Sequence, residues 1–158
     1  FPYTTLFRSS SFRLPAGTKY LIGHNIDFDW VAIGSPEVKR ICTLALARSL
    51  WPELDSHTQS ALLYYFERDT AREQLRNAHS ALADVWICSK IVGQIIDKLH
   101  PVSLDALWEM SEKARIPTTM PYGKHKGELI SQVPSDYKQW LLRQDNVSGY
   151  LRKALEAK

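Results

Sequence analysis

The sequence predicts an α/β fold followed by a small α+β module at its carboxy-terminal end. A short apolar run at 19–25 is bounded by turn residues and is typical of a buried strand, and a second run at 38–43 has a β-like sequence. The second run passes into the helical pattern LALARSLW, which stops before Pro52 because proline disfavours helix in the residue before it. Apolar residues at helical spacing between 82 and 99 predict a long amphipathic helix. Strands that alternate with helices are the usual pattern of an α/β domain.

Length and composition indicate a folded globular chain. The 158 residues are about the size of one ordinary domain, and the apolar (44%) and charged (23%) fractions lie near globular averages. A net charge of +3 suits a phosphate-rich partner such as nucleic acid without requiring one. No apolar run approaches the ~20 residues that span a bilayer, so we expect no membrane partner. Cys42 and Cys88 both lie in apolar stretches, and we expect two reduced core thiols in a cytoplasmic protein.

The first 17 residues differ in composition from the rest of the chain. They are rich in Ser, Thr and Arg and contain no acidic residue, as in a transit peptide. FPYTTLFRS also resembles the translation of a sequencing adaptor, and we favour this explanation for residues 1–9. The natural chain would then begin near Ser10 or Ser11, within a longer protein, and residues 1–17 would be a non-native scar and linker.

Turn and capping residues set the expected limits of the elements. The strand at 19–25 should end at Gly23 or His24, and Asp27 is able to cap a short helix that ends at 34–36. A further helix is expected within 57–69. The long helix carries apolar residues at 82, 85, 86, 91, 92, 95, 96 and 99. We assign residues 18–101 to a partial first domain.

The small module is expected at 102–158. Ser103 is placed to cap a helix, and 116–134 is rich in Pro, Gly and basic residues, as in short strands or a hairpin. Helical character resumes at 135–144.

Two polar stretches carry the candidate chemistry. GHNIDFDW contains Asp27 and Asp29, and HSALADVW contains His79 and Asp84. Five helical positions separate two side chains by ~140°, so His79 and Asp84 share a site only if His79 lies in the loop or first turn. Asp84 would then lie on the inner face beside Ala81, whose small side chain leaves room for a ligand. Each stretch alone is more typical of turns and caps, but together they favour a shared site.

The same residues carry a family resemblance. HN-x-x-FD followed by H-x-A-x-x-D is similar to the second and third motifs of the DEDDh exonucleases, a ribonuclease H-like superfamily that cleaves nucleotides from 3′ ends with two metal ions. RICTLALARSLWPEL, HSALAD and TTMPYGKHKGELISQVPSDYKQWLL together resemble the bacterial exodeoxyribonuclease X group. The resemblance covers residues 18–158. It implies a ribonuclease H-like fold, hydrolysis of phosphodiester bonds and DNA 3′ ends as the partner.

The resemblance implies a role for each matching residue. Asp29 matches the carboxylate of the second motif, Asp84 and His79 match the third, and Asp27 falls on a variable position. Asp29 and Asp84 would help to hold two Mg²⁺ or Mn²⁺ ions, which prefer hard oxygen ligands and stabilise both oxygens of an in-line displacement. His79 would take the proton of the attacking water, since a histidine titrates near neutral pH.

Further residues are candidate substrate contacts. Asn25 would donate a hydrogen bond to the terminal nucleotide and Phe28 would form an apolar wall, or else the two are a turn amide and a core aromatic. A basic and aromatic cluster in the module is of the kind that meets phosphates and stacks on bases, or else it is an exposed lysine hairpin beside a buried tryptophan. The cluster consists of Tyr122, Lys124, His125, Lys126 and Trp140.

The first motif of the superfamily, an Asp-x-Glu on an early strand, has no match. Residues 1–26 contain no Asp or Glu, so two metal ions would have half of their protein ligands. We expect this chain to lack the early strands of the fold, to expose a sheet edge and to be inactive or nearly so.

Two alternatives stay open. The chain could be a nucleic-acid-binding module without catalysis, or the exonuclease could act on RNA, because no residue here identifies a contact to a 2′-hydroxyl. No small-molecule cofactor is expected, and neither strand preference nor oligomeric state follows from these residues.

Overall fold

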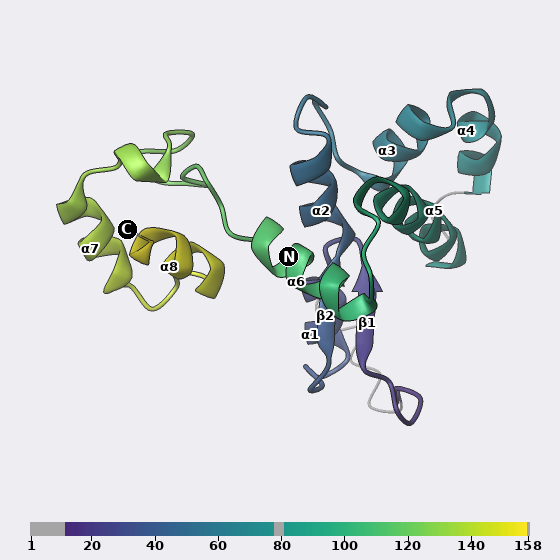
Figure 1. Cartoon of the computed structure of the whole chain (residues 1–158), viewed down its shortest axis with the longest axis horizontal. Coiled ribbons are helices and arrows are strands. Elements are labelled where there is room, and N and C mark those ends of the chain that lie inside the picture. Colours follow the sequence, from purple (N-terminus) through teal and green to yellow (C-terminus); the bar gives the residue numbers. More distant parts are fainter. Residues whose placement is uncertain (1–11, 78–80, 158) are drawn as a thin grey trace. The chain divides into compact units, whose positions relative to one another are not determined.

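The computed structural model describes residues 12–77 and 81–157. The chain forms two compact units, residues 1–111 and 112–158. The division falls inside a helix and lies later than the predicted boundary at 101. Figure 1 shows a short sheet with helices around it in the first unit and a small helical second unit.

The first unit mixes strands and helices and is mostly helical. Its elements, in chain order, are β1 (Tyr20–Gly23), α1 (Ile26–Ala32), β2 (Lys39–Cys42), α2 (Thr43–Leu50), α3 (Gln59–Phe66), α4 (Arg68–Gln74), the 3₁₀ turn η1 (Leu75–Asn77), α5 (Ala81–Leu99) and α6 (Leu104–Ala114). Both predicted strands and the helix that follows the second one are confirmed. The long helix is also confirmed, as α5, the longest of the described helices.

The sheet is a parallel pair of strands, in which Tyr20 lies opposite Lys39 and Gly23 lies opposite Cys42. Parallel strands need a crossover, and α1 provides it. Asp105 of α6 is bonded to both strands, because it accepts a hydrogen bond from Tyr20 Oη at 2.7 Å and forms an ion pair with Lys39. Within the described residues the sheet has these two strands and no more.

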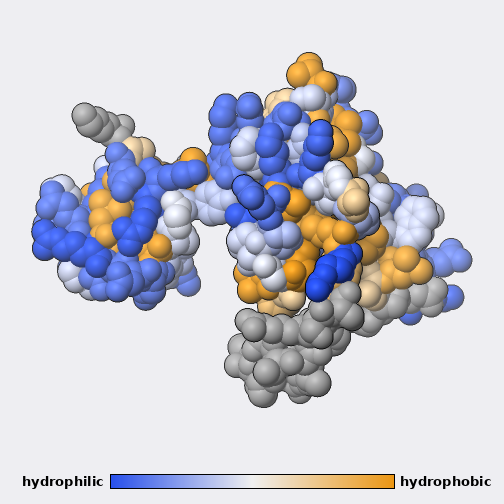
Figure 2. Space-filling view, turned by 90° about the horizontal axis from the view of Figure 1, so that it is seen from below, coloured by the Kyte–Doolittle hydropathy of each residue, from blue (hydrophilic) through white to orange (hydrophobic). Residues whose placement is uncertain are grey.

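The core of the first unit lies where α5 packs on α2 and α3. The buried face of α5 carries Ile87, Cys88, Ile91 and Ile95. The apolar residues at 82, 85, 86 and 96 are exposed instead, although they belong to the set that gave the helix its periodicity. The α5 helix therefore has an apolar face toward the core and a second apolar surface that no described residue buries, and orange atoms gather on the first unit in Figure 2.

Asp27 does not cap α1, so this interpretation was wrong. The helix begins at Ile26, because the turn places Asn25 in the left-handed region at φ 63° as its N-cap residue. Asp27 therefore lies inside the first turn, and its carboxylate forms an ion pair with Arg40 of β2. The guanidinium of Arg40 also lies 4.0 Å from the centroid of the Trp30 ring.

The second unit is built from η2 (Ile130–Gln132), α7 (Ser135–Leu142) and α8 (Gly149–Glu156). Its core consists of Met120, Ile130, Val133, Leu141, Val147, Leu151, Ala154 and Leu155. The expected hairpin is reduced to a single antiparallel bridge between Thr119 and Leu129. Ser148 caps α8 through a hydrogen bond from Leu151 N at 3.2 Å, and sequence reasoning did not single out this helix.

Three smaller expectations concern single residues and surfaces. Cys42 and Cys88 are free and buried, so the prediction of reduced core thiols is confirmed. Ser103 accepts a hydrogen bond from Ala106 N at 3.1 Å, as expected of a cap. Among the helices of the described residues, none is both long and apolar enough to cross a membrane.

Ser111 provides a test of how the sheet is held. Its hydroxyl is fully buried and accepts a hydrogen bond from Cys42 N at 2.8 Å. Because Ser111→Ala leaves this N–H without its acceptor, we expect a loss of ~1–3 kcal/mol in the free energy of unfolding, measured by urea denaturation. The control Ser89→Ala removes an exposed hydroxyl and should change it by less than about 0.5 kcal/mol. Equal midpoints for the two variants would contradict this account.

Candidate functional site

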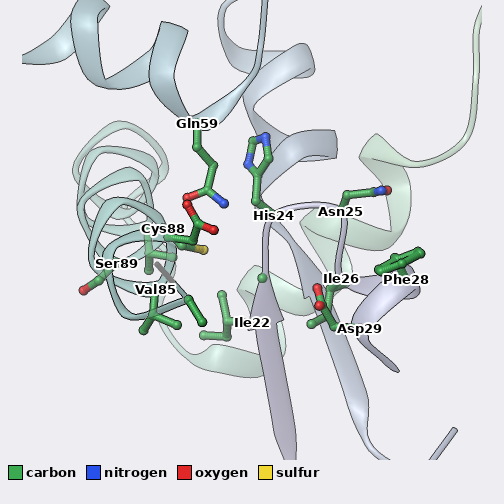
Figure 3. A pocket seen from close by; sticks show the side chains of 14 residues that line it. Ile22, His24, Asn25, Ile26, Phe28, Asp29, Gln59, Val85, Cys88 and Ser89 are labelled. Carbon is green, nitrogen blue, oxygen red and sulfur yellow. The ribbon is translucent and has the colours of Figure 1, made fainter. Parts of the chain in front are cut away.

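A pocket of about 740 Å³ lies where β1 ends. It is lined by the last residues of β1 and the turn after it, by α1, by Gln59 at the start of α3 and by one face of α5. Figure 3 shows the labelled residues of α1 and of α5 on opposite sides of the end of β1. The pocket therefore joins the two polar stretches that the sequence singled out.

Asp29 and Asp84 both line this pocket. Asp29 comes from α1 and Asp84 from the first turn of α5, and both side chains belong to exposed residues. Loss of hydration raises the pKa of Asp29 above its ordinary value, and a backbone hydrogen bond only partly offsets this rise. Ala81 lines the pocket next to Asp84, as expected.

Gln59 contributes a polar atom that the described residues leave unpaired. Its Oε1 is buried, no hydrogen-bond partner for it exists among them, and the residue lines the pocket with Asp29 and Asp84. A buried amide oxygen without a partner costs free energy, so its position invites a ligand that donates a hydrogen bond or positive charge. Sequence reasoning missed Gln59, because nothing distinguishes it from other polar residues at a helix start.

His24 fixes the turn at the floor of the pocket. Its Nδ1 lies 3.0 Å from Thr43 Oγ1 and its Nε2 lies 2.8 Å from the carbonyl oxygen of His57. The ring thus links the end of β1 to the start of α2 and to the loop before α3. Burial lowers the pKa of His24, and the neutral ring matches one nitrogen that donates and one that accepts. The sequence pattern predicted only that the first strand ends at Gly23 or His24, and it gave no sign of these hydrogen bonds.

The other predicted site residues are distributed as follows. Asn25 and Phe28 line the same pocket, and Phe28 is 66% exposed, so it is not a core aromatic. In Figure 3 both side chains are directed away from α5. His79 lies outside the described residues. Lys124 and Lys126 belong to the second unit and do not line this pocket.

The pocket offers a divalent cation only part of a ligand set. Two carboxylates and a free amide oxygen are donors of the type that Mg²⁺ prefers. No group of three His, Cys, Asp or Glu side chains that could hold a metal ion is present among the residues described. The oxygen atoms of Asp29, Asp84 and Gln59 thus suit a divalent cation by chemical type, but the described residues alone do not form a complete metal site.

Comparison with known proteins gives two kinds of match. Two curated relatives, both named exodeoxyribonuclease 10, come from Escherichia coli strain K12 and Escherichia coli O6:H1 strain CFT073. Each is 26% identical to this chain over 144 residues, which cover 89% of this chain and 64% of the relative. Over most of its length the chain is thus similar to an exonuclease, and it spans 64% of the length of the curated relatives that it matches.

A family model described as "putative quorum-sensing-regulated virulence factor" matches residues 93–157. This segment begins at residue 93 inside α5, runs through α8 and contains the whole second unit except its last residue. No solved structure matches the chain.

The buried neutral His24 predicts how stability depends on pH. Because its folded pKa is lowered, its contribution to stability is present above the ordinary pKa of about 6.5 and is lost as the pH falls through the lower folded value. We expect the free energy of unfolding to decline between pH 7 and pH 5, and His24→Gln to flatten this decline while costing ~1–2 kcal/mol at pH 7. Urea denaturation at several pH values measures both effects.

The matched control is His100→Asn, which removes an exposed histidine at φ 47° and keeps a side chain suited to that backbone. It should retain the decline. If the free energy of unfolding of His24→Gln declines with falling pH as steeply as that of the unchanged chain, then protonation of His24 is not the cause of the decline.

Proposed function

We propose that this chain is the greater part of a metal-dependent 3′ to 5′ exodeoxyribonuclease, which removes nucleotides from DNA 3′ ends by hydrolysis. The observation that carries the proposal is the shared pocket of Asp29 and Asp84, next to the unpaired oxygen of Gln59. The two aspartates lie on different helices, far apart in sequence, and they are the two that match the family motifs. The similarity to proteins named exodeoxyribonuclease supports the choice of DNA.

In the proposed reaction, water attacks the phosphorus of the last phosphodiester and the bond from phosphorus to the 3′ oxygen breaks. The products are a nucleoside monophosphate and a strand shortened by one nucleotide. Two bound Mg²⁺ or Mn²⁺ ions would stabilise the attacking and leaving oxygens. Asp29 and Asp84 would hold the ions, and His79 would take the proton from the attacking water.

The turn after β1 and the exposed ring of Phe28 would position the terminal nucleotide. Asn25 adopts a left-handed conformation in this turn, and its side chain lines the pocket on the side away from α5. Phe28 offers an open apolar surface on which a base or sugar can pack. Asp27 takes no part, because its carboxylate is engaged by Arg40.

We propose further that the other carboxylates come from an Asp-x-Glu segment upstream of this sequence. Support comes from the exposed apolar surface of α5, which carries Leu82, Val85 and Trp86 at 71%, 65% and 63% exposure. Surfaces of this kind usually mark an interaction site. On this proposal the 158 residues alone are inactive or nearly so, because two carboxylates hold two ions poorly.

The proposal is tested with a completed chain, in which an upstream segment bearing Asp-x-Glu precedes this sequence. With Mg²⁺ and a 3′-labelled DNA oligonucleotide, we expect labelled mononucleotide as the first product, while the 158 residues alone release at least about a hundredfold less. Gel and thin-layer analysis of the product distinguish one nucleotide from longer fragments. Failure of the completed chain to release mononucleotides would contradict the proposal.

Variants of the completed chain assign the roles. Asp29→Asn and His79→Ala should each lower kcat by at least about a hundredfold, as expected of groups acting on the reacting atoms, with Tm and DNA affinity nearly unchanged. Asp27→Asn is the matched control, which should lower Tm and leave kcat within about twofold. Faster digestion of a matched RNA oligonucleotide would overturn the choice of DNA.

A further inference from the structure

The second unit carries the positive charge of this chain. Residues 112–158 contain nine basic residues (Lys and Arg) and five acidic residues (Asp and Glu). Residues 1–111 contain eleven basic and twelve acidic residues. The net charge of +3 is therefore concentrated in a unit of under fifty residues. The face of this unit seen in Figure 2 is mostly hydrophilic, around a small apolar area. A unit with this excess of positive charge attracts a polyanion.

This unit has a pocket of its own, of about 290 Å³. One side comes from the loop after Met120, which supplies Lys124 and His125, and the other from Asp136, Tyr137 and Trp140 of α7. The size suits a single planar group rather than a large ligand. The pocket lies wholly within the second unit, so its geometry does not depend on the first.

The loop is held rigidly against α7. Met120 N donates to Glu128 O and Gly127 N donates to Met120 O, both at 2.8 Å, which closes the loop at its base. Gly123 has φ 81°, and a Cβ on it would lie 2.6 Å from the hydroxyl oxygen of Tyr137. Only glycine fits this position, and Tyr137 Oη also accepts a hydrogen bond from Lys124 N at 3.4 Å. The basic residues are thus presented beside the aromatic ones in a fixed arrangement.

The aromatic side of the pocket is a wall of three neighbouring rings. His125 meets Tyr137 edge to face at 4.6 Å between ring centroids, and Tyr137 lies 5.4 Å from Trp140 with the planes tilted by 35°. Trp140 ends this wall with 52% of its surface exposed. An indole left this open at a pocket rim is an apolar platform, and bases stack on such platforms at ~1–3 kcal/mol each.

The charges around the pocket suit a nucleotide better than a free phosphate. Lys124 and Lys126 are exposed, and no ion pair with an acidic side chain of the described residues engages either one. His125 Nδ1 is bonded to Glu128 Oε2 at 2.9 Å. Asp136 adds a carboxylate that repels a phosphate but accepts a hydrogen bond from the amino group of a base. A phosphate would therefore lie on the lysine side and a base on the α7 side.

We propose that this pocket binds one nucleotide of single-stranded DNA, with its base stacked on Trp140 and Tyr137 and its phosphate beside Lys124. The choice of DNA rests on the proposed function, whereas the existence of the site does not. A base must be unstacked to reach such a platform, so the site selects single strands over duplex.

The test measures binding by the 158-residue chain without metal, so that it is independent of hydrolysis. In EDTA, the fluorescence anisotropy of a labelled oligo(dC) 12-mer is titrated with protein at several salt concentrations. Trp140→Ala should weaken binding on the order of tenfold without changing the salt slope. Lys124→Gln should reduce the slope of log K against log salt by ~0.7, as expected for one phosphate contact to a single strand. Duplex DNA of equal length should bind more weakly.

Matched controls separate the site from general attraction. Tyr65→Ala removes an aromatic side chain of nearly equal exposure, 51% against 52%, from the first unit, and Lys113→Gln removes one exposed positive charge from the second unit outside the pocket. Both should bind like the unchanged chain. Melting curves check that Trp140→Ala remains folded, and Lys124→Gln provides the readout if it does not.

Equal weakening by Lys113→Gln and Lys124→Gln, or unchanged binding by folded Trp140→Ala, would overturn the proposed site. Binding without nuclease activity in the completed chain would contradict the proposed function and leave this site standing. Nuclease activity without these binding effects would contradict the proposed site and leave the proposed function standing.

Discussion

The parallel register of β1 and β2 is the constraint on which the site depends. With Gly23 opposite Cys42, the turn that leaves β1 lies beside the start of α2, and His24 can reach Thr43 with one nitrogen and the carbonyl of His57 with the other. These two hydrogen bonds of the imidazole hold the turn that leads into α1, and α1 carries Asp29. The pocket then forms between α1 and α5, which is the usual location of a ligand in a parallel sheet, beyond the carboxyl ends of its strands.

The two aspartates of α1, Asp27 and Asp29, lie in different electrostatic environments. Asp27 forms an ion pair with Arg40, and the fold uses its charge. Loss of hydration raises the pKa of Asp29, and Gln59 Oε1 has no hydrogen-bond partner among the described residues. Perturbed and unsatisfied polar groups tend to gather at functional sites, because a ligand completes them. Their convergence on one pocket is a physical reason to place the chemistry there.

Local patterns predicted much of this structure. Strand limits, the switch from strand to helix after Cys42 and the length of α5 follow from turn residues and periodicity, which act over a few residues. The sequence also predicted a shared site for Asp29 and Asp84; both residues line one pocket, and their role stays a prediction. Tertiary relations did not follow: Asp27 resembled a cap because its partner Arg40 lies on another element, and Gln59 has no local signal at all. The buried face of α5 was also ambiguous, because apolar residues occupy two of its surfaces.

We propose that Asp29 and Asp84 contribute to one divalent-cation site and that Asp27 does not. Electron paramagnetic resonance of Mn²⁺ titrated into the completed chain distinguishes these roles, because it counts bound metal without substrate or turnover. We expect Asp29→Asn and Asp84→Asn each to weaken Mn²⁺ binding at least about tenfold, while Asp27→Asn binds like the unchanged protein. Unaltered Mn²⁺ affinity in either of the first two variants, with the protein folded, would contradict this proposal.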